Sequence, residues 1–377
     1  MNARTPPVAI VRAYRVERYP ELVQQSVTLQ LKPPHAMHAD EAQALDGPAR
    51  RLFKKQIPEA APVTADSTAL FRFGEQCNNH CPMCSNTGDP SLVLRSTDEL
   101  LRRAAFLHHC GFRRVVVTGG EATIHPGFWT VIEGLAGFGM VWDVNTHGRS
   151  FSRPDFAQRA VDTGLQRAIV SLHSHHAATS AAIFGSNEDA HREAVAGVER
   201  LLEARVEVML NCVLTRLNLD QLDDYLTATT QRFGNQVTVK FVFPSSLGRG
   251  GRWPGIATLR YREVRERVQR LRALGAQLRL RLCFESFPNC ILGDRTAFNL
   301  GRSGFGETHY LDDATGDRVY AMRHIEAELS AFGEGCQRCV ALPECPGVAL
   351  EYAERFGVDE LTVFPSQSCL SSEQATR

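Results

Sequence analysis

The chain has 377 residues with 42 Lys+Arg against 42 Asp+Glu, a formal net charge of zero, so neither a basic nucleic-acid footprint nor an acidic tail stands out. Hydrophobic residues make up 43% and charged residues 22%, which is ordinary globular usage and argues against disorder over most of the length. At about 150 residues per domain, the length leaves room for two or three domains, or for one large barrel with an appendage.

Apolar runs in the sequence are short. Stretches such as 115–117 and 206–214 fall below the roughly 20 residues that span a bilayer. The four-residue run after Pro7 is too short for the core of a signal peptide. We therefore expect a soluble, cytoplasmic protein that has no membrane and no nucleic acid as a partner.

Residues 1–66 are rich in proline in patches. They hold one strand-like stretch at 26–31 and one short helical candidate at 40–55. We expect this segment to be an N-terminal extension that lies on the main domain, not a free domain.

Strands and helices are expected to alternate in the next part of the chain, which we assign to residues 67–250. The strand candidates are 70–73, 114–118, 140–145, 168–173, 206–214 and 237–243. Ser96 to Glu99 has the pattern of a capping box. Strands that carry Val/Ile/Leu runs and are joined by crossover helices predict a parallel α/β sheet covered on both faces. Six units are too few to close an eight-stranded barrel, so either a partial barrel or an open sheet is expected.

Residues after about 276 lose this alternation and become rich in glycine and cysteine. Such a composition suits a small domain held together by a metal centre more than by a hydrophobic core. We assign 251–377 to a linker helix followed by this small domain.

Cysteine usage is the most informative count, because eleven is high and most of the cysteines fall in two tight groups. The groups are Cys77, Cys81 and Cys84, and Cys336, Cys339 and Cys345. In a chain without an export signal, clustered thiols predict metal ligands before they predict disulfides.

The first group has the spacing C-x3-C-x2-C and lies on the loop that leaves the first predicted strand. In a parallel α/β barrel, the loops at the strand C-termini carry the chemistry. Three thiolates can hold three irons of a [4Fe–4S] cluster and leave the fourth iron open, whereas fully ligated clusters use four cysteines. A zinc site that adds His80 is the alternative, but zinc ligands more often come as separated C-x2-C pairs.

A second motif follows one βα unit later, where an apolar strand ends in Gly119-Gly120-Glu121. Two glycines let a ligand approach the backbone closely, and a carboxylate can accept from an ammonium group.

Together the two motifs resemble the radical S-adenosylmethionine superfamily, over roughly residues 69–243. The resemblance implies a partial (β/α)6 TIM-like barrel in which Cys77, Cys81 and Cys84 bind a [4Fe–4S] cluster. It implies that the amino and carboxylate groups of S-adenosylmethionine chelate the open iron. It also implies an external one-electron reductant of the flavodoxin or ferredoxin type.

Positions that contact S-adenosylmethionine follow from the same resemblance. Gly119, Gly120 and Glu121 would hold the amino group, and Met83 would lie against the adenine. Polar groups at strand ends would meet the ribose and the carboxylate, although each could instead be satisfied by backbone or water; these are Asn145, Ser171 and Asn211. We expect His173, His175 and His176 to be solvated or to face substrate and not to bind metal.

The second group, C-x2-C-x5-C, resembles the SPASM/twitch domains that hold auxiliary iron–sulfur clusters. Ala349 stands where the two-cluster pattern has a further cysteine, so we expect one auxiliary [4Fe–4S] cluster. Its fourth ligand is open between Cys290, which we prefer, Cys369 and Cys283. A zinc site is the alternative here too. Cys110 and Cys212 are expected to be structural.

The resemblance implies reductive cleavage of S-adenosylmethionine to a 5′-deoxyadenosyl radical that abstracts hydrogen from a substrate. Maturation of a ribosomally synthesised peptide is the preferred role, and oxidation or rearrangement of a small molecule such as an aminoglycoside is the alternative. A zinc-stabilised, non-catalytic binding protein is the alternative from another class.

Overall fold

The structure is a computed structural model that describes residues 52–53, 63–64, 66–86, 94–245, 254–294, 308–313 and 315–365. The strand-like stretch at 26–31 and the alternative ligand Cys369 lie outside these residues. At 52–53 the expected helix over 40–55 is wrong, because the chain forms strand β1 (Leu52–Phe53) there. This strand pairs with β11 near the other end of the chain, so a tertiary contact overrides the local helical pattern.

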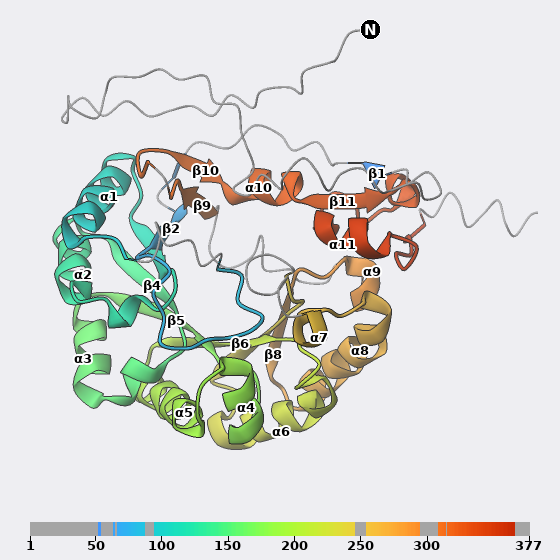
Figure 1. Ribbon diagram of the computed structural model, residues 1–377, viewed down its shortest axis with the longest axis horizontal. Coiled ribbons are helices and arrows are strands. Elements are labelled where there is room, and N and C mark those ends of the chain that lie inside the picture. The colour runs from blue at the N-terminus through green and yellow to red at the C-terminus, as the bar shows by residue number, and fades with distance from the viewer. Residues whose placement is uncertain are drawn as a thin grey trace, which may run out of the picture.

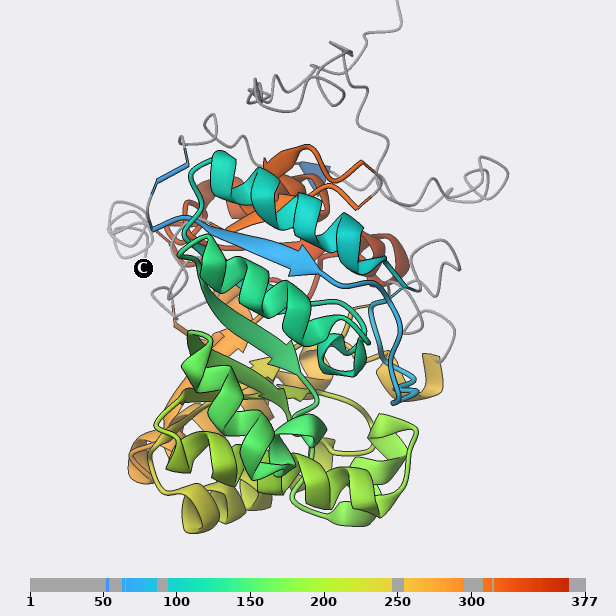
Figure 2. The same cartoon turned by 90° about the vertical axis from the view of Figure 1, so that its left-hand side faces the viewer.

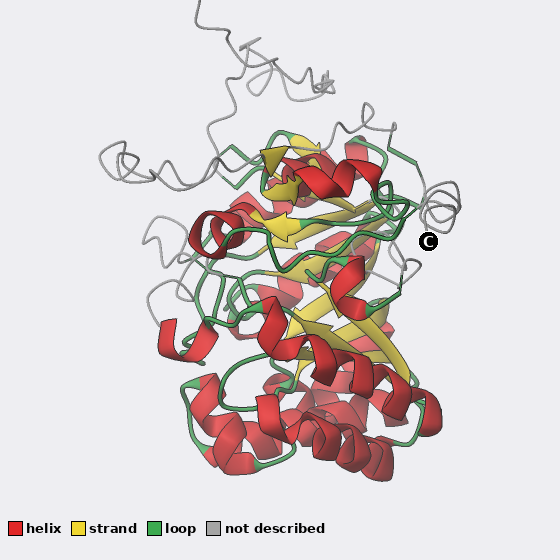
Figure 3. Cartoon of the chain, turned by 90° about the vertical axis from the view of Figure 1, so that its right-hand side faces the viewer, coloured by secondary structure: helices red, strands yellow, loops and turns green. Residues whose placement is uncertain are grey.

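Nine strands form the main sheet, in the order β10-β9-β2-β3-β4-β5-β6-β7-β8. From β2 to β8 each strand pairs in parallel with the next along the chain. Their bounds are β2 (Thr68–Arg72), β3 (Arg114–Thr118), β4 (Val141–Thr146), β5 (Leu165–Ser171), β6 (Glu207–Val213), β7 (Val237–Val242) and β8 (Arg281–Glu285). The sheet curves with helices on its outer side (Figures 1 and 3), which is the partial barrel expected from the sequence.

The outer layer consists of helices that follow the strands. They are α1 (Thr97–His109), α2 (Phe128–Gly137), α3 (Pro154–Asp162), α4 (Ala177–Phe184), α5 (Glu188–Glu203), α6 (Leu222–Phe233) and α8 (Tyr261–Gln277). The start of α1 shows half of the expected capping box: Ser96 Oγ accepts from the Glu99 amide at 3.1 Å, while the Glu99 carboxylate pairs with Arg95 and Arg103. No helix in the described segments is both long and apolar enough to cross a lipid bilayer.

The parallel sheet continues past residue 250, where the sequence suggested that the barrel ends. Helix α8 packs on the outside, and β8 extends the sheet beside β7 over five residue pairs. The barrel therefore has a seventh unit. Its strand, Arg281–Glu285, is short and charged at both ends, which hides it from a search for apolar runs.

The chain then returns to the first strand of the barrel. Strand β9 (Thr308–Leu311) pairs in parallel with β2, and β10 (Val319–Ala321) pairs antiparallel with β9. Arg72, Arg95 and Arg103 all donate hydrogen bonds to Asp313 in the turn between these two strands. Figure 2 shows β2 beside the segment coloured orange to red, so the C-terminal part of the chain covers the open edge of the barrel.

Beyond this hairpin lies a small unit. It has a three-stranded sheet of β1, β11 (Ser330–Gly333) and β12 (Val348–Ala349). Its helical elements are α10 (Met322–Glu328), the 3-10 turn η8 (Glu334–Arg338) and α11 (Leu350–Phe356). The short helix α9 (Asn289–Leu292), which follows β8, contributes to the same region.

The two faces of the barrel sheet differ in chemistry. In β6, Val208, Leu210 and Cys212 belong to the main hydrophobic core between sheet and helices. Because successive side chains of a strand point to opposite faces, Met209 and Asn211 face the barrel interior. The interior therefore offers polar groups at the carboxyl ends of the strands.

Candidate active site

The loop that carries the first three cysteines leaves the carboxyl end of β2. Cys77, Cys81 and Cys84 are each half-buried. Two backbone hydrogen bonds tie the loop to the segment after β3: Gly120 N–H donates to Gly74 O and Glu121 N–H donates to Gln76 O, both at 2.7 Å. The cysteine loop and the glycine motif therefore lie side by side at the mouth of the barrel.

The two glycines are needed for this contact between the chain's own loops. A Cβ on Gly119, whose φ is +134°, would lie 2.3 Å from Gly74 O, and a Cβ on Gly120 would lie 2.1 Å from Gln76 O. The close backbone approach in this structure is that of the cysteine loop. The contact of Gly119 and Gly120 with the amino group of S-adenosylmethionine remains a prediction.

A third anchor holds the middle of the cysteine loop to the end of α4. The His80 amide donates to Phe184 O at 2.8 Å, and Gly185 follows with a left-handed φ of +57°. A side chain at Gly185 would come within 2.4 Å of His80 O. The polypeptide thus anchors the loop at its start and in its middle.

The carboxylate of Glu121 is buried and accepts hydrogen bonds from its own chain. Oε1 accepts from Thr123 Oγ1 at 2.7 Å and from Thr146 Oγ1 at 2.8 Å, while Oε2 accepts from the His147 amide at 2.8 Å. These contacts join the segments after β3 and β4. The contact expected with an ammonium group remains a prediction, and the observed role of this carboxylate is to brace the two segments.

Residues after β4 reach back to the cysteine loop. Arg149 N–H donates to Nδ1 of the His147 imidazole, which leaves Nε2 to donate to Asn78 Oδ1 at 2.6 Å. Burial lowers the pKa of His147 despite the neighbouring Glu121 carboxylate, so the neutral ring that this pattern needs is favoured. Sequence reasoning missed both contacts, because nothing local links residues 78 and 147.

Polar residues predicted at the strand ends share one level of the barrel. Ser171 in β5 is in register with Asn211 in β6, which is in register with Lys240 in β7. Within the described residues, the buried Oδ1 of Asn211 has no hydrogen-bond partner. Asn145, in β4, is half-buried near the same end of the sheet. Lys240 was not predicted; its Nζ donates to Glu285 Oε2 on β8 at 2.7 Å.

Met83 is buried beside the last cysteine of the loop. It packs against Ile183 and Ala257 in a small apolar cluster that Cys81 also contacts. The contact with adenine expected for Met83 remains a prediction. The structure packs this side chain against Ile183 of α4, beside the cysteine loop.

The histidines after β5 differ in their surroundings. His173 is buried, and its Nδ1 accepts from the Val213 amide at 3.2 Å. The rings of His175 and His176 lie 3.8 Å apart between centroids. In the described part of the chain, no three His, Cys, Asp or Glu side chains converge closely enough to hold a single metal ion.

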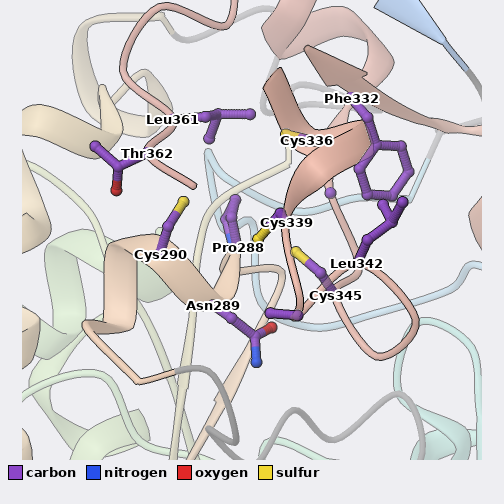
Figure 4. A pocket seen from close by; sticks show the side chains of 12 residues that line it. Pro288, Asn289, Cys290, Phe332, Cys336, Cys339, Leu342, Cys345, Leu361 and Thr362 are labelled. Carbon is purple, nitrogen blue, oxygen red and sulfur yellow. The ribbon is translucent and has the colours of Figure 1, made fainter. Parts of the chain in front are cut away.

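Four cysteines line one pocket in the C-terminal unit. Cys290 comes from α9, and Cys336, Cys339 and Cys345 come from the segment after β11. Figure 4 shows their sulfur atoms around a common space, with Leu342 and Leu361 among the walls. Cys283 lies elsewhere, in the barrel, where it packs against Ile169 and Met209.

Burial and mutual proximity both affect the thiols of this pocket. Burial raises the pKa of Cys345 to about 11 and also raises the pKa values of Cys290 and Cys336. Neighbouring thiols of the set raise these pKa values further, which shows that the four cysteines interact. Backbone groups of Thr362 and Gly347 donate hydrogen bonds to the sulfurs of Cys290 and Cys345, respectively. Four neighbouring thiols with such donors match the type of ligand set that a four-cysteine iron–sulfur cluster uses, and ligation of a cluster here remains a prediction.

Cys110 and Cys212 are buried in the main core, as expected for structural cysteines. Burial raises the pKa of Cys110 to about 12 and that of Cys212 further still. Both thiols are therefore held in the protonated form within the apolar core.

Known proteins resemble part of this chain. Residues 71–228 match the sequence profile of the Radical SAM superfamily. A probable GTP 3′,8-cyclase from Sulfurisphaera tokodaii is 28% identical over 198 residues, which are 52% of this chain and 60% of that protein. GTP 3′,8-cyclase from Clostridium perfringens is 21% identical over 220 residues, 55% of this chain and 64% of that protein. The chain thus spans less than two thirds of these curated relatives.

Among solved structures, Streptococcus suis SuiB bound to its precursor peptide SuiA overlaps with a TM-score of 0.46 at 12% identity. The overlap covers 58% of this chain and 48% of that one. An overlap of this size does not bear on the substrate.

Proposed function

We propose that Cys77, Cys81 and Cys84 hold the [4Fe–4S] cluster that radical S-adenosylmethionine enzymes use with S-adenosylmethionine. The proposal starts from residues 71–228, which form a radical S-adenosylmethionine domain, the catalytic unit of this superfamily of enzymes. When bound, the two cofactors supply one-electron cleavage of the sulfonium to a 5′-deoxyadenosyl radical that abstracts hydrogen from a substrate. The observation that carries the proposal is the pair of 2.7 Å hydrogen bonds that join the cysteine loop to Gly120 and Glu121.

The chain's own residues have three tasks in this proposal. The glycine motif and Gly185 fix the backbone of the cysteine loop beside the carboxyl ends of β2 and β3. Glu121 holds the segments after β3 and β4 together. Asn145, Ser171 and Asn211 offer polar contacts at the carboxyl ends of the strands, and the partnerless Oδ1 of Asn211 supports a ligand there.

We further propose that Cys290, Cys336, Cys339 and Cys345 hold one auxiliary [4Fe–4S] cluster in a SPASM/twitch-like domain within 251–377. The shared pocket, the mutual effect of the thiols on their pKa values and the N–H donors to sulfur support this assignment. An external one-electron donor of the flavodoxin or ferredoxin type would reduce the enzyme.

For the substrate we propose a ribosomally synthesised peptide, on the resemblance of the C-terminal cysteine spacing to SPASM/twitch domains. A purine nucleotide is the second candidate, favoured by the curated relatives named GTP 3′,8-cyclase. GTP deuterated at C3′ separates the two, because a nucleotide cyclase of that kind would transfer deuterium to 5′-deoxyadenosine. Unlabelled 5′-deoxyadenosine and unchanged GTP would rule the nucleotide out.

The central assignment is tested by the triple variant C77A/C81A/C84A. We expect it to lose reductive cleavage of S-adenosylmethionine completely, because no cluster with an open iron would form. The matched control C336A/C339A should keep uncoupled cleavage, since those cysteines lie in the other pocket. Production of 5′-deoxyadenosine by the triple variant would overturn the assignment.

A further inference from the structure

Asn79 lies in the cysteine loop, between Cys77 and Cys81, and is almost completely buried. It is 3% exposed, although its neighbours Asn78 and His80 are both exposed. Its backbone amide donates to Cys77 Sγ at 3.4 Å. Asn79 is therefore the residue of this loop that turns inward beside a cluster-binding thiol.

The orientation of the Asn79 side chain is fixed by Arg149. Arg149 Nη1 donates to Asn79 Oδ1 at 3.0 Å, and Arg149 Nε is itself held by Glu193 Oε2 at 2.6 Å. A guanidinium has donors but no acceptor, so the oxygen of the amide must face Arg149. The amide nitrogen, Nδ2, must then point the other way.

Nδ2 of Asn79 is buried and, within the described residues, donates to no acceptor. A buried donor without an acceptor is unfavourable and uncommon in folded proteins, and it indicates an acceptor that the described residues do not supply. Two further polar groups of Asn79, Oδ1 and the backbone N–H, are engaged with Arg149 and Cys77, respectively. The remaining donor thus belongs to a loop whose proposed task is to hold an iron–sulfur cluster.

We propose that Asn79 Nδ2 donates a hydrogen bond to a sulfur of the [4Fe–4S] cluster held by Cys77, Cys81 and Cys84, and thereby raises its reduction potential. The inference rests on the proposed function. Reduction adds negative charge to the cluster, so a hydrogen-bond donor to sulfur stabilises the reduced form more than the oxidised form. Arg149 is the positioning residue that turns the donor toward the cluster.

The test is the midpoint potential of this cluster, measured by EPR-monitored titration in the absence of S-adenosylmethionine. The protein carries C336A/C339A so that one cluster is observed. We expect N79A to shift the potential to a more negative value, by about tenfold in the equilibrium constant for one-electron reduction, or about 59 mV. N79D, which keeps an oxygen for Arg149 but has no donor, should shift it in the same direction. N78A is the matched control from the same loop, and its potential should stay at the parent value.

A second measurement leaves Asn79 in place, and it tests the inference even if the Asn79 variants fail to retain iron. In protein made with ¹⁵N-labelled asparagine side chains, electron–nuclear double resonance on the reduced cluster should detect a coupled nitrogen, and N78A should keep it. Absence of the coupling, or equal potentials for N79A and N78A, would overturn the inference. A shift seen only with S-adenosylmethionine bound would also overturn it, because the donor would then serve that molecule. A parent protein that binds four irons and cleaves S-adenosylmethionine leaves the proposed function intact in each of these cases.

Discussion

The hydroxyl of Tyr261 donates a 2.9 Å hydrogen bond to the backbone carbonyl of Ser286, the residue at which the chain leaves β8. Ser286 has a φ of +64°, and a residue other than glycine in this left-handed region costs about 1–3 kcal/mol. The turn leads within four residues to Cys290 in the cysteine pocket. Tyr261, at the start of α8, stacks on Phe243 at 4.0 Å between centroids. This hydrogen bond therefore fixes the path by which the barrel presents Cys290.

We expect Tyr261→Phe to weaken the auxiliary site, because the strained turn at Ser286 loses its bond. Tyr225→Phe is the matched control: Tyr225 is equally buried, and its hydroxyl donates to Leu172 O at 2.9 Å, within the barrel. Each substitution should lower the free energy of unfolding by about 1 kcal/mol. Only Tyr261→Phe should lower the iron retained by the auxiliary site on gel filtration. Equal iron retention in the two variants would show that the turn does not depend on this hydroxyl.

Cys290 and Cys283 offer a matched pair of cysteines, seven residues apart. Cys290 lines the four-cysteine pocket, whereas Cys283 packs in the barrel with Ile169 and Met209. Anaerobically reconstituted protein should hold about eight irons, from two four-iron clusters. We expect Cys290→Ala to reduce this to about four, and Cys283→Ala to leave it unchanged. A full complement in Cys290→Ala would show that the fourth ligand comes from elsewhere.

Gly120→Ala should abolish cluster binding at the first site. Its Cβ would lie 2.1 Å from Gln76 O, so the cysteine loop would have to move away from the segment after β3. Gly137→Ala is the control, because a Cβ there would meet nothing within 4 Å. Iron content and cleavage of S-adenosylmethionine should be lost in the first variant and kept in the second. If Gly120→Ala keeps both, the tight contact of the two loops is not required.

The free energy of unfolding should decrease as the pH falls from 6.5 toward 4, because His173 stays neutral in the native protein over this range. Burial lowers the pKa of His173 from 6.5 to about 4, so between these values the unfolded chain binds a proton that the native protein does not. This contribution to stability is complete above pH 6.5 and is lost as the pH falls toward 4, about 3 kcal/mol in total.

Urea unfolding at pH 7 and pH 5.5 checks this expectation. His173→Gln should show a smaller loss of unfolding free energy between the two values than the parent protein. His109→Asn, at an exposed position, should behave like the parent. An identical loss in all three proteins would show that His173 does not carry the pH dependence.

The parallel sheet could be predicted from the sequence because its central strands are buried on both faces. Strand β3 was expected at 114–118 and lies at Arg114–Thr118, since its three consecutive valines leave little ambiguity. The strand at 281–285 was missed because its inner-face positions are Arg281, Cys283 and Glu285, which read as a polar segment. An apolar pattern cannot reveal a strand whose polar face lines the interior of a barrel.

The two groups of cysteines could be recognised as candidate ligands from their spacing. The hydrogen bonds that hold the surrounding segments in place could not be predicted. Asp313 binds three arginines that lie more than 200 residues before it, and only the return of β9 to β2 brings them together. In the same way, Asn79 and Arg149 have no sequence relationship that would suggest a contact. Such pairs depend on which strand edges meet, and that is a property of topology.

The pairing of β2 with β9 has a consequence for biosynthesis. Strand β2 ends at residue 72 and its partner β9 begins at residue 308. During synthesis, this edge of β2 therefore stays without β9 until the residues between them have been made. At translation rates of about 5–20 residues per second, this interval is on the order of 10–50 s. An uncovered strand edge invites pairing with other chains, and charged side chains along it oppose such aggregation. Before Asp313 is synthesised, Arg72, Arg95 and Arg103 lack it as a common partner, and Arg72 is the charged side chain that β2 itself carries. Once Asp313 is made, the same three side chains dock the segment that covers this edge.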